Sequence, residues 1–192
     1  VLVLLLTVIL VAAIVASPFG ILFSNESREA GVVPLSAAVA QVNYEYNERL
    51  EELQTADSYD SISVTGQSAD WVEVLAVFAV KVAGSNDADA ADVATMDADR
   101  IARLKAVFWD MTTIAHRIEV IHHPGSGDDD GWTERNLYIT ITAKTAEEMK
   151  TVYHFNRNQI AALDELLEQR DLLRELIEDV YSVSGDTAAL IR

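Results

Sequence analysis

The sequence predicts an α+β protein with an N-terminal transmembrane helix, then a mostly helical domain carrying a small antiparallel sheet. Residues 1–23 contain no charged side chain. Several later segments repeat apolar residues every three or four positions, and a few short ones alternate apolar and polar residues. We therefore divide the chain into a transmembrane anchor or uncleaved signal (1–23), a linker (24–34), an acidic extracytoplasmic α+β domain (35–181) and a linker or the start of a further module (182–192).

The opening segment has the sequence VLVLLLTVILVAAIVASPFGILF, and a bilayer is crossed by about 20 apolar helical residues. A cleaved signal peptide is the alternative, because Ala13, Ala16 and Ser17 are small residues of the kind that precede a cleavage site. Pro18 follows directly, however, and the apolar run continues to Phe23, which favours a retained anchor. A buried core helix fits less well, because the run is long and wholly uncharged.

The following flank has no excess of Lys or Arg, which fits an orientation with the rest of the chain outside the cytoplasm. We therefore expect a cell-membrane protein whose bulk is extracytoplasmic and whose first partner is the membrane itself.

The composition restricts the partners. The chain has 192 residues, a formal net charge of −17 and no cysteine. This charge repels nucleic acid and anionic membrane surfaces, and it favours solubility, cations or basic partners. The lack of cysteine excludes disulfides, thiolate metal sites and cysteine nucleophiles, and it fits an extracytoplasmic protein that does without disulfides.

The first element of the domain is predicted to be an amphipathic helix over residues 35–53. Its apolar positions recur at intervals of three and four and are Leu35, Val39, Val42, Tyr46, Leu50 and Leu53. Its reverse face is charged and carries Glu45, Glu48, Arg49, Glu51 and Glu52. Because the apolar stripe lasts under three heptads, we expect it to pack on the domain core and not to form a coiled coil.

Residues 61–65 alternate apolar and polar side chains and predict a short strand that ends at Gly66. Asp70 then begins a helix, with Glu73 three residues on, in an Asp variant of the capping box. The helix has the sequence WVEVLAVFAVKV, which is apolar almost all round. We expect it to be the central buried helix of the domain.

A second amphipathic helix is predicted from about Asp97 to Ala115. Its apolar stripe is Ile101, Leu104, Phe108, Met111 and Ala115. Beyond it, residues 118–122 and 137–142 alternate apolar and polar side chains on either side of the turn-rich segment PGSGDDDGW. Together they predict a long-looped antiparallel hairpin.

Two short helices follow the hairpin. Thr145 with Glu148 forms a capping box for the first, and Asn156 with Gln159 marks the start of the second. A last charged helical stretch carries Leu172, Leu173, Leu176, Ile177 and Val180.

Histidines are the first candidates for a metal site: His116, His122, His123 and His154. His122 and His123 are adjacent, so on a strand they face opposite sides and cannot easily chelate one ion. No H-E-x-x-H motif is present, so we assign the histidines structural or surface positions.

The second candidate metal site is the acidic run Asp128, Asp129 and Asp130 in the hairpin loop, whose oxygens would suit Ca²⁺. Its spacing differs from that of a calcium-binding helix-loop-helix, and the loop around Asp87, Asp89 and Asp92 fails the same test. We interpret both as solvated acidic loops, and we expect no metal and no cofactor.

Glu73 is the one carboxylate that suggests catalysis. A buried glutamate can protonate a glycosidic oxygen, but helix capping explains this residue equally well. Trp71, Phe78, Phe108 and Trp109 could line a sugar groove, although aromatic residues at helical spacing are more often core. No serine elbow and no phosphate-binding glycine loop is present. We therefore expect no catalytic residue in this chain and keep Glu73 as the alternative.

Several strings occur in a characteristic order: ASPFGILFS, DWVEVLAVFAVKVAG, LKAVFWDMTTI, LYITITAKTAEEM and YHFNRNQIAALDELL. They resemble the N-terminal region of cell-wall hydrolases carried by conjugative and other mobile elements of Firmicutes. The resemblance covers the chain from about Val1 to Leu173. In such proteins, a membrane anchor and a domain like this one precede a catalytic module, usually a cysteine peptidase of the NlpC or CHAP type.

The resemblance implies a cell-wall context, with the catalytic Cys-His module beyond Arg192. No catalytic residue is carried over, because the chain has no cysteine. The first hypothesis is a non-catalytic anchored domain that positions this module, or binds peptidoglycan or conjugation-machinery proteins. The alternative is a muramidase-like domain that cleaves glycan strands with Glu73 as the general acid.

Overall fold

The computed structural model describes residues 33, 35–83, 96–126, 130–171 and 174. Within these residues the chain forms five helices and three strands, which confirms the α+β class. The helices are α2 (Leu35–Thr55), α3 (Trp71–Ala83), α4 (Ala98–Met111), α5 (Ala146–Val152) and α6 (Arg157–Glu168). The strands are β1 (Ser61–Gly66), β2 (Thr112–His123) and β3 (Trp132–Ala143).

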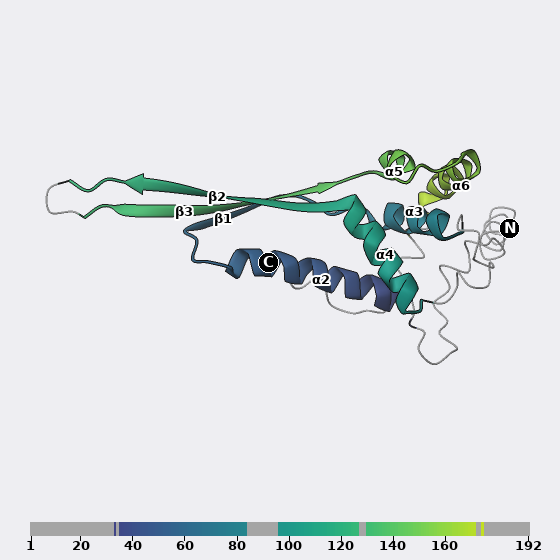
Figure 1. The fold of residues 1–192 in the computed structure, drawn as a ribbon, viewed down its shortest axis with the longest axis horizontal. Helices are drawn as coiled ribbons and strands as arrows, with labels where there is room; N and C mark the ends of the chain where they lie inside the picture. Colours follow the sequence, from purple (N-terminus) through teal and green to yellow (C-terminus); the bar gives the residue numbers. More distant parts are fainter. Residues whose placement is uncertain (1–32, 34, 84–95, 127–129, 172–173, 175–192) are drawn as a thin grey trace, which may run out of the picture.

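The molecule has two parts that differ in shape (Figure 1). Helices α3, α4, α5 and α6 gather at one end, and we call them the helical body. Strands β2 and β3 leave this body as a long hairpin, which we call the arm, and α2 runs alongside the sheet.

The sheet has the strand order β1-β3-β2. Strands β2 and β3 pair antiparallel from Thr112 opposite Ala143 to His123 opposite Trp132, which confirms the predicted hairpin. Strand β1 pairs parallel with β3, so the sheet is mixed and the prediction of an antiparallel sheet was wrong in this respect. Alternating side chains identify a strand but not its direction. The parallel pair becomes possible because α3, α4 and β2 form a long connection between β1 and β3.

Strand β1 ends at a close backbone contact. Gly66 has φ of +86°, and a Cβ atom there would lie 1.9 Å from the carbonyl oxygen of Ile141. Only glycine fits this position without displacing β3, which explains why the predicted strand ends here.

Helix α3 is the centre of the helical body, as predicted. Leu75, Ala76, Ala79 and Val80 are almost fully buried, and the same cluster contains buried residues from α2, α4, α5 and α6. From α4 it receives the buried side chains of Leu104, Val107, Phe108 and Met111. Helix α3 is apolar on nearly all sides, and the surrounding helices cover this apolar surface.

Helix α2 joins the helical body to the sheet, which confirms its predicted packing on the core. Its first half places Leu35, Val39 and Val42 in the core cluster around α3. Its second half, with Leu50 and Leu53, packs against a second buried cluster on β3 formed by Leu137, Ile139 and Ile141. One face of β3 is therefore covered by α2.

Helix α4 is shorter than predicted. Asp97 caps its start, accepting a hydrogen bond from the N–H of Arg100, but the helix ends at Met111 instead of Ala115. Residues 112–115 pair with β3 as the first part of β2. Ala115 matches the apolar helix spacing by coincidence, whereas pairing with β3 and the β-branched residues 112–114 favour a strand.

The two short helices begin as predicted. Thr145 and Glu148 form a complete capping box on α5, and Asn156 and Gln159 form one on α6. In both caps, the capping side chains and the backbone N–H groups that they bind lie within four consecutive residues. The capping motifs can therefore be recognised from the sequence alone.

None of the helices in the described part of the chain is long and apolar enough to cross a membrane. The predicted anchor at 1–23 lies outside the described residues, as do nearly all of the predicted linker 24–34, the loop at 84–92 and the segment 182–192. The apolar positions of the last predicted helical stretch also lie outside them.

Candidate functional site

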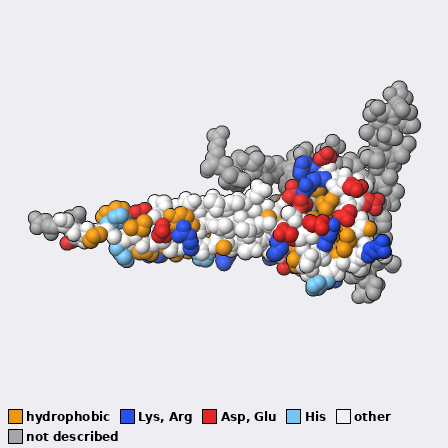
Figure 2. All heavy atoms as spheres, turned by 90° about the horizontal axis from the view of Figure 1, so that it is seen from above, with side chains coloured by type: hydrophobic (Ala, Val, Ile, Leu, Met, Phe, Trp, Pro, Cys, Tyr) orange, Lys and Arg blue, Asp and Glu red, His pale blue; other side chains and the backbone are white. Residues whose placement is uncertain are grey.

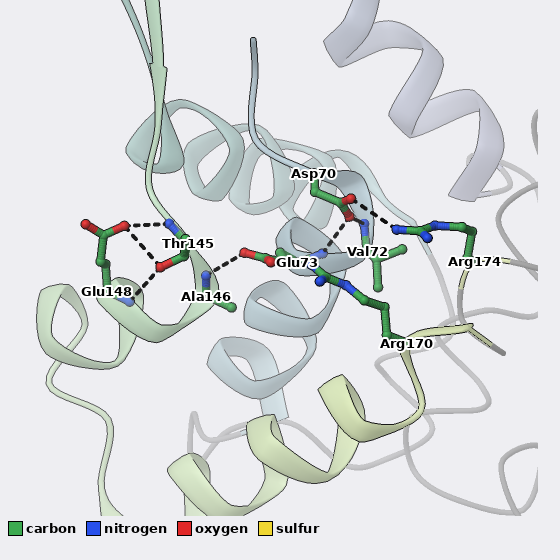
Figure 3. Close-up of polar contacts among 8 residues, drawn as sticks. All are labelled: Asp70, Val72, Glu73, Thr145, Ala146, Glu148, Arg170 and Arg174. Carbon is green, nitrogen blue, oxygen red and sulfur yellow. Dashed lines mark hydrogen bonds and ion pairs between the residues drawn. The ribbon is translucent and has the colours of Figure 1, made fainter. Parts of the chain in front are cut away.

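The start of α3 contains the one acid that the sequence suggests for catalysis. Asp70 precedes the helix, and its Oδ1 atom accepts hydrogen bonds from the N–H groups of Val72 (2.8 Å) and Glu73 (3.4 Å). Asp70 therefore caps α3 as predicted. The Glu73 side chain does not complete the predicted capping box, because its carboxylate turns toward α5 and α6 (Figure 3).

Both carboxylate oxygens of Glu73 have partners from distant elements. Oε2 accepts a hydrogen bond of 2.7 Å from the backbone N–H of Ala146, the first residue of α5. Oε1 forms an ion pair with Arg170, just after α6. The Glu73 side chain is 17% exposed. We call Glu73, Ala146 and Arg170 the Glu73 junction, because it joins three helices.

A second ion pair lies beside this junction. Arg174 lies 3.5 Å from the Oδ2 atom of Asp70, so two arginines after α6 face two acids at the start of α3 (Figure 3). Neither arginine was predicted from the sequence. Their partners lie about a hundred positions away, and no local pattern points to such a contact.

This geometry favours a structural role for Glu73. Its two contacts come from an N–H group and a guanidinium, which are both donors, so the carboxylate acts as an acceptor. A general acid must instead present a proton to the leaving oxygen of its substrate. Glu73 faces α5 and the segment after α6.

The aromatic residues near Glu73 belong to the core and do not line a sugar groove together. Trp71 stacks on Phe108 with ring centroids 5.1 Å apart, and its indole N–H donates to the Oδ1 atom of Asn43 (3.0 Å). Phe78 and Phe108 are fully buried. Trp109 borders a cleft whose lining does not include Trp71, Phe78 or Phe108.

That cleft lies between α2 and the junction of α4 with β2 and has a volume of about 710 Å³. Its lining is mostly charged or polar and comprises Glu45, Glu48, Arg49, Glu52, Lys105, Trp109, Thr112, Thr113 and Ile114. Glu45 and Lys105 form an ion pair across it. The charged reverse face of α2 was visible in the sequence, but its meeting with α4 and β2 was not.

The histidines do not gather into one site. His116, His122 and His123 lie on β2, and His154 occupies a turn with φ of +52°. His122 lies 3.1 Å from the hydroxyl of Thr133, whereas His123 stacks on Trp132 with centroids 3.9 Å apart. In the described part of the chain, no group of three or more His, Asp or Glu residues could hold a metal ion.

The acidic candidates for calcium are only partly described. Asp130 is exposed beside Gly131, at the end of the arm, and Asp128 and Asp129 lie outside the described residues. Asp87, Asp89 and Asp92 lie outside them as well. The interpretation of both runs as solvated acidic loops, with calcium binding as the alternative, therefore stays a prediction.

The far half of the arm carries large apolar side chains that the fold leaves exposed. These are Ile118, Val120, Ile121 and Trp132. Figure 2 shows charged side chains gathered over the helical body, and apolar and histidine side chains toward the far end of the arm. The consecutive apolar pair Val120 and Ile121 already places one large side chain on each face of β2.

Comparison of the chain with models of protein families, with curated proteins and with solved structures found no match. The function is therefore inferred from the residues and their contacts.

Proposed function

We propose that this chain is a non-catalytic, membrane-anchored extracytoplasmic domain of a mobile-element cell-wall hydrolase. It positions the catalytic module of that hydrolase, or it binds peptidoglycan or proteins of the conjugation machinery. The Glu73 junction is the observation that carries the proposal. The one acid that the sequence offers for glycan cleavage is taken up by contacts that hold three helices together.

The shape of the molecule supports a role in positioning or binding. The arm projects from the helical body (Figure 1). Its far half exposes Ile118, Val120, Ile121 and Trp132. Exposed apolar side chains grouped on one element are typical of interaction surfaces.

The anchoring part of the proposal rests on the sequence. Residues 1–23 are uncharged and long enough to span a bilayer, and the whole chain has a net charge of −17. The hydrolase context rests on the ordered strings quoted above. A cysteine peptidase module would have to come from outside these residues, because the chain has no cysteine.

The muramidase-like alternative is less well supported. Glycan cleavage needs an acid and usually a second carboxylate, about 5–10 Å apart across a groove. The polar cleft described above is lined by Glu45, Glu48 and Glu52, among others, and does not include Glu73. The acid proposed from the sequence and the acids that line this cleft are therefore different residues.

Incubation of the full chain, in mild detergent, with purified peptidoglycan tests catalysis directly. We expect no soluble muropeptides by mass spectrometry, and the same result for Glu73→Gln and for the control Glu52→Gln. Muropeptide release that disappears in Glu73→Gln, with folding retained by circular dichroism, would contradict the proposal and make Glu73 catalytic.

The anchoring claim has a separate test in a Gram-positive host. A tag placed after Arg192 should stay with the membrane after an alkaline carbonate wash, and protease added to intact protoplasts should remove it. A tag recovered in the soluble cytoplasmic fraction would show that the chain is neither anchored nor exported.

A further inference from the structure

The outer edge of β2 is open. The strand order β1-β3-β2 places β2 at one side of the sheet, and within the described residues no strand pairs with its outer edge. β2 runs for 12 residues and carries Ile118, Val120 and Ile121, all exposed. Proteins usually shorten, charge or cover such an edge, because its free N–H and C=O groups pair readily with another strand.

The charges on β2 indicate which strand would pair with it. Arg117 and Glu119 lie on one face of the strand with Ile118 between them on the other face. Tyr138 of β3 holds both charged side chains. The Arg117 guanidinium lies 3.9 Å from the centre of its ring, and its hydroxyl donates to Glu119 (3.0 Å). In the single chain, one positive and one negative group therefore lie side by side on β2, with Arg117 3.9 Å from Glu119, and both contact Tyr138 of β3.

Such a sequence is complementary to itself when read in the opposite direction. Suppose that two copies of β2 pair antiparallel and are related by a twofold axis. Residues that face each other must have their side chains on the same side of the sheet, so the axis must pass between the two copies of one residue. Centring on Ile118 places Arg117 of each copy opposite Glu119 of the other. Centring on Arg117 or on Glu119 places identical charges face to face, which is unfavourable.

We propose that β2 binds β2 of a second copy of this chain, antiparallel and centred on Ile118. The result is a symmetric dimer with a continuous sheet in the order β1-β3-β2-β2-β3-β1. Residues 113–123 of each copy face the same residues of the other. This inference goes beyond the proposed function, because it does not depend on what the domain positions or anchors.

The proposed pairing places the exposed apolar side chains of β2 in the interface. Ile118 of one copy lies directly opposite Ile118 of the other, and Val120 is its diagonal neighbour across the interface. On the charged face, Ile121 lies opposite Ala115. The interface therefore has an apolar centre on one face and two reciprocal ion pairs on the other.

A single introduced thiol tests the register. The chain has no cysteine, so Ile118→Cys carries the only one. In the proposed dimer, facing Cβ atoms are about 4.5–5.5 Å apart, which is within reach of a short bismaleimide but at or beyond the usual span of a disulfide. After treatment of the full chain in detergent with a short bismaleimide, we expect a covalent dimer on a denaturing gel.

Ile121→Cys is the matched control on the same strand. Its two copies would lie six positions apart along the sheet, or about 20 Å, and should not cross-link. Equal cross-linking of the two variants, or none with Ile118→Cys, would overturn the proposed register.

Charge reversal tests the ion pairs by an independent measurement. Glu119→Arg and Arg117→Glu each place like charges opposite one another, and we expect the dimer dissociation constant from sedimentation velocity to rise at least about tenfold. The double variant should recover dimerisation, because it restores opposite charges across the axis. Glu165→Arg, at an exposed position on α6, makes the same change in net charge as Glu119→Arg but away from β2, and it should leave the dimer unchanged.

Folding of each variant is checked by circular dichroism. Dimers that resist both single reversals, or a double variant that stays monomeric while folded, would show that another surface or another partner strand is used. Copies that associate through residues 1–23 would also be insensitive to these charges. Resistance to the charge reversals therefore distinguishes such association from pairing through β2.

Discussion

The carboxylate of Glu73 connects α3 to α5 and to the segment after α6, which lie far apart in the sequence. It accepts a hydrogen bond from Ala146 at the start of α5 and pairs with Arg170 after α6. Removing the carboxylate leaves one backbone N–H and one guanidinium without this partner. Donors left unsatisfied in a partly buried site cost more free energy than the hydrogen bond itself contributes.

We expect Glu73→Ala to lower the free energy of unfolding by about 2–3 kcal/mol. Glu73→Gln should cost less, about 1 kcal/mol, because the amide oxygen can still accept from Ala146 while the ion pair is lost. The measurement is urea denaturation followed by circular dichroism.

Glu52→Ala is the matched control for this prediction. Glu52 pairs with Arg49 on α2, but its side chain is 58% exposed, so we expect a cost below about 0.5 kcal/mol. Equal effects of Glu73→Ala and Glu52→Ala would show that the Glu73 junction contributes nothing to stability.

Glu148 should make stability depend on pH. The backbone N–H of Thr145 (2.7 Å) and its hydroxyl (3.0 Å) donate to the carboxylate and hold the pKa of Glu148 below its ordinary value. The folded state therefore binds this proton less readily than the unfolded state. The resulting stabilisation is present above the ordinary carboxyl pKa and is lost as the pH falls through the lowered value.

Glu148→Gln should accordingly lose less stability than the unmodified chain when the pH is lowered from 7 to 3. Urea denaturation at several pH values measures this difference, with Glu165→Gln as the control that keeps the cap. Identical pH profiles for Glu148→Gln and the unmodified chain would show that the cap does not couple to protonation.

Helix α3 is the element on which the helical body depends. Its side chains from Val74 to Val80 are all buried, and α4, α5 and α6 pack around it. A cavity made in this helix cannot be filled by solvent or by a mobile neighbour, because its surroundings are themselves close-packed.

Leu75→Ala should therefore lower the free energy of unfolding by about 2–5 kcal/mol, from lost burial and from the cavity that remains. Val152→Ala on α5 is the control, because Val152 is 45% exposed, and its cost should stay below about 0.5 kcal/mol. A cost below about 0.5 kcal/mol for Leu75→Ala itself would mean that α3 is peripheral to stability.

The whole molecule combines an uncharged opening segment, a packed helical body and a projecting arm (Figure 1). The body and the arm share α2, whose two halves contribute to the two buried clusters. The proposed anchoring requires that residues 1–23 remain attached to this domain.

We expect residues 1–23 to be retained in the mature protein, because the apolar run continues past Pro18 to Phe23. Mass spectrometry of the intact protein isolated from a Gram-positive host gives the position of its N-terminus. A new N-terminus between Ser17 and Ser24 would identify the segment as a cleaved signal peptide.

Periodicity and capping were sufficient to predict most of the elements. The spacing of Leu35, Val39 and Val42, and the apolar run of α3, correctly predicted two helices and their buried faces. The boxes at Thr145 and Asn156 correctly predicted two helix starts. These signals are local, because a cap or a stripe depends on side chains within about one turn of each other.

Contacts between distant residues decided the rest. Residues 112–115 became a strand because β3 was available to pair with them, and β1 became parallel because the chain returned beside it. Glu73 left the predicted capping box for partners 73 and 97 positions away. The sequence by itself determined the local elements and the buried stripes. The tertiary structure alone decided the strand order, the end of α4 and the role of Glu73, because each depends on groups that only folding brings together.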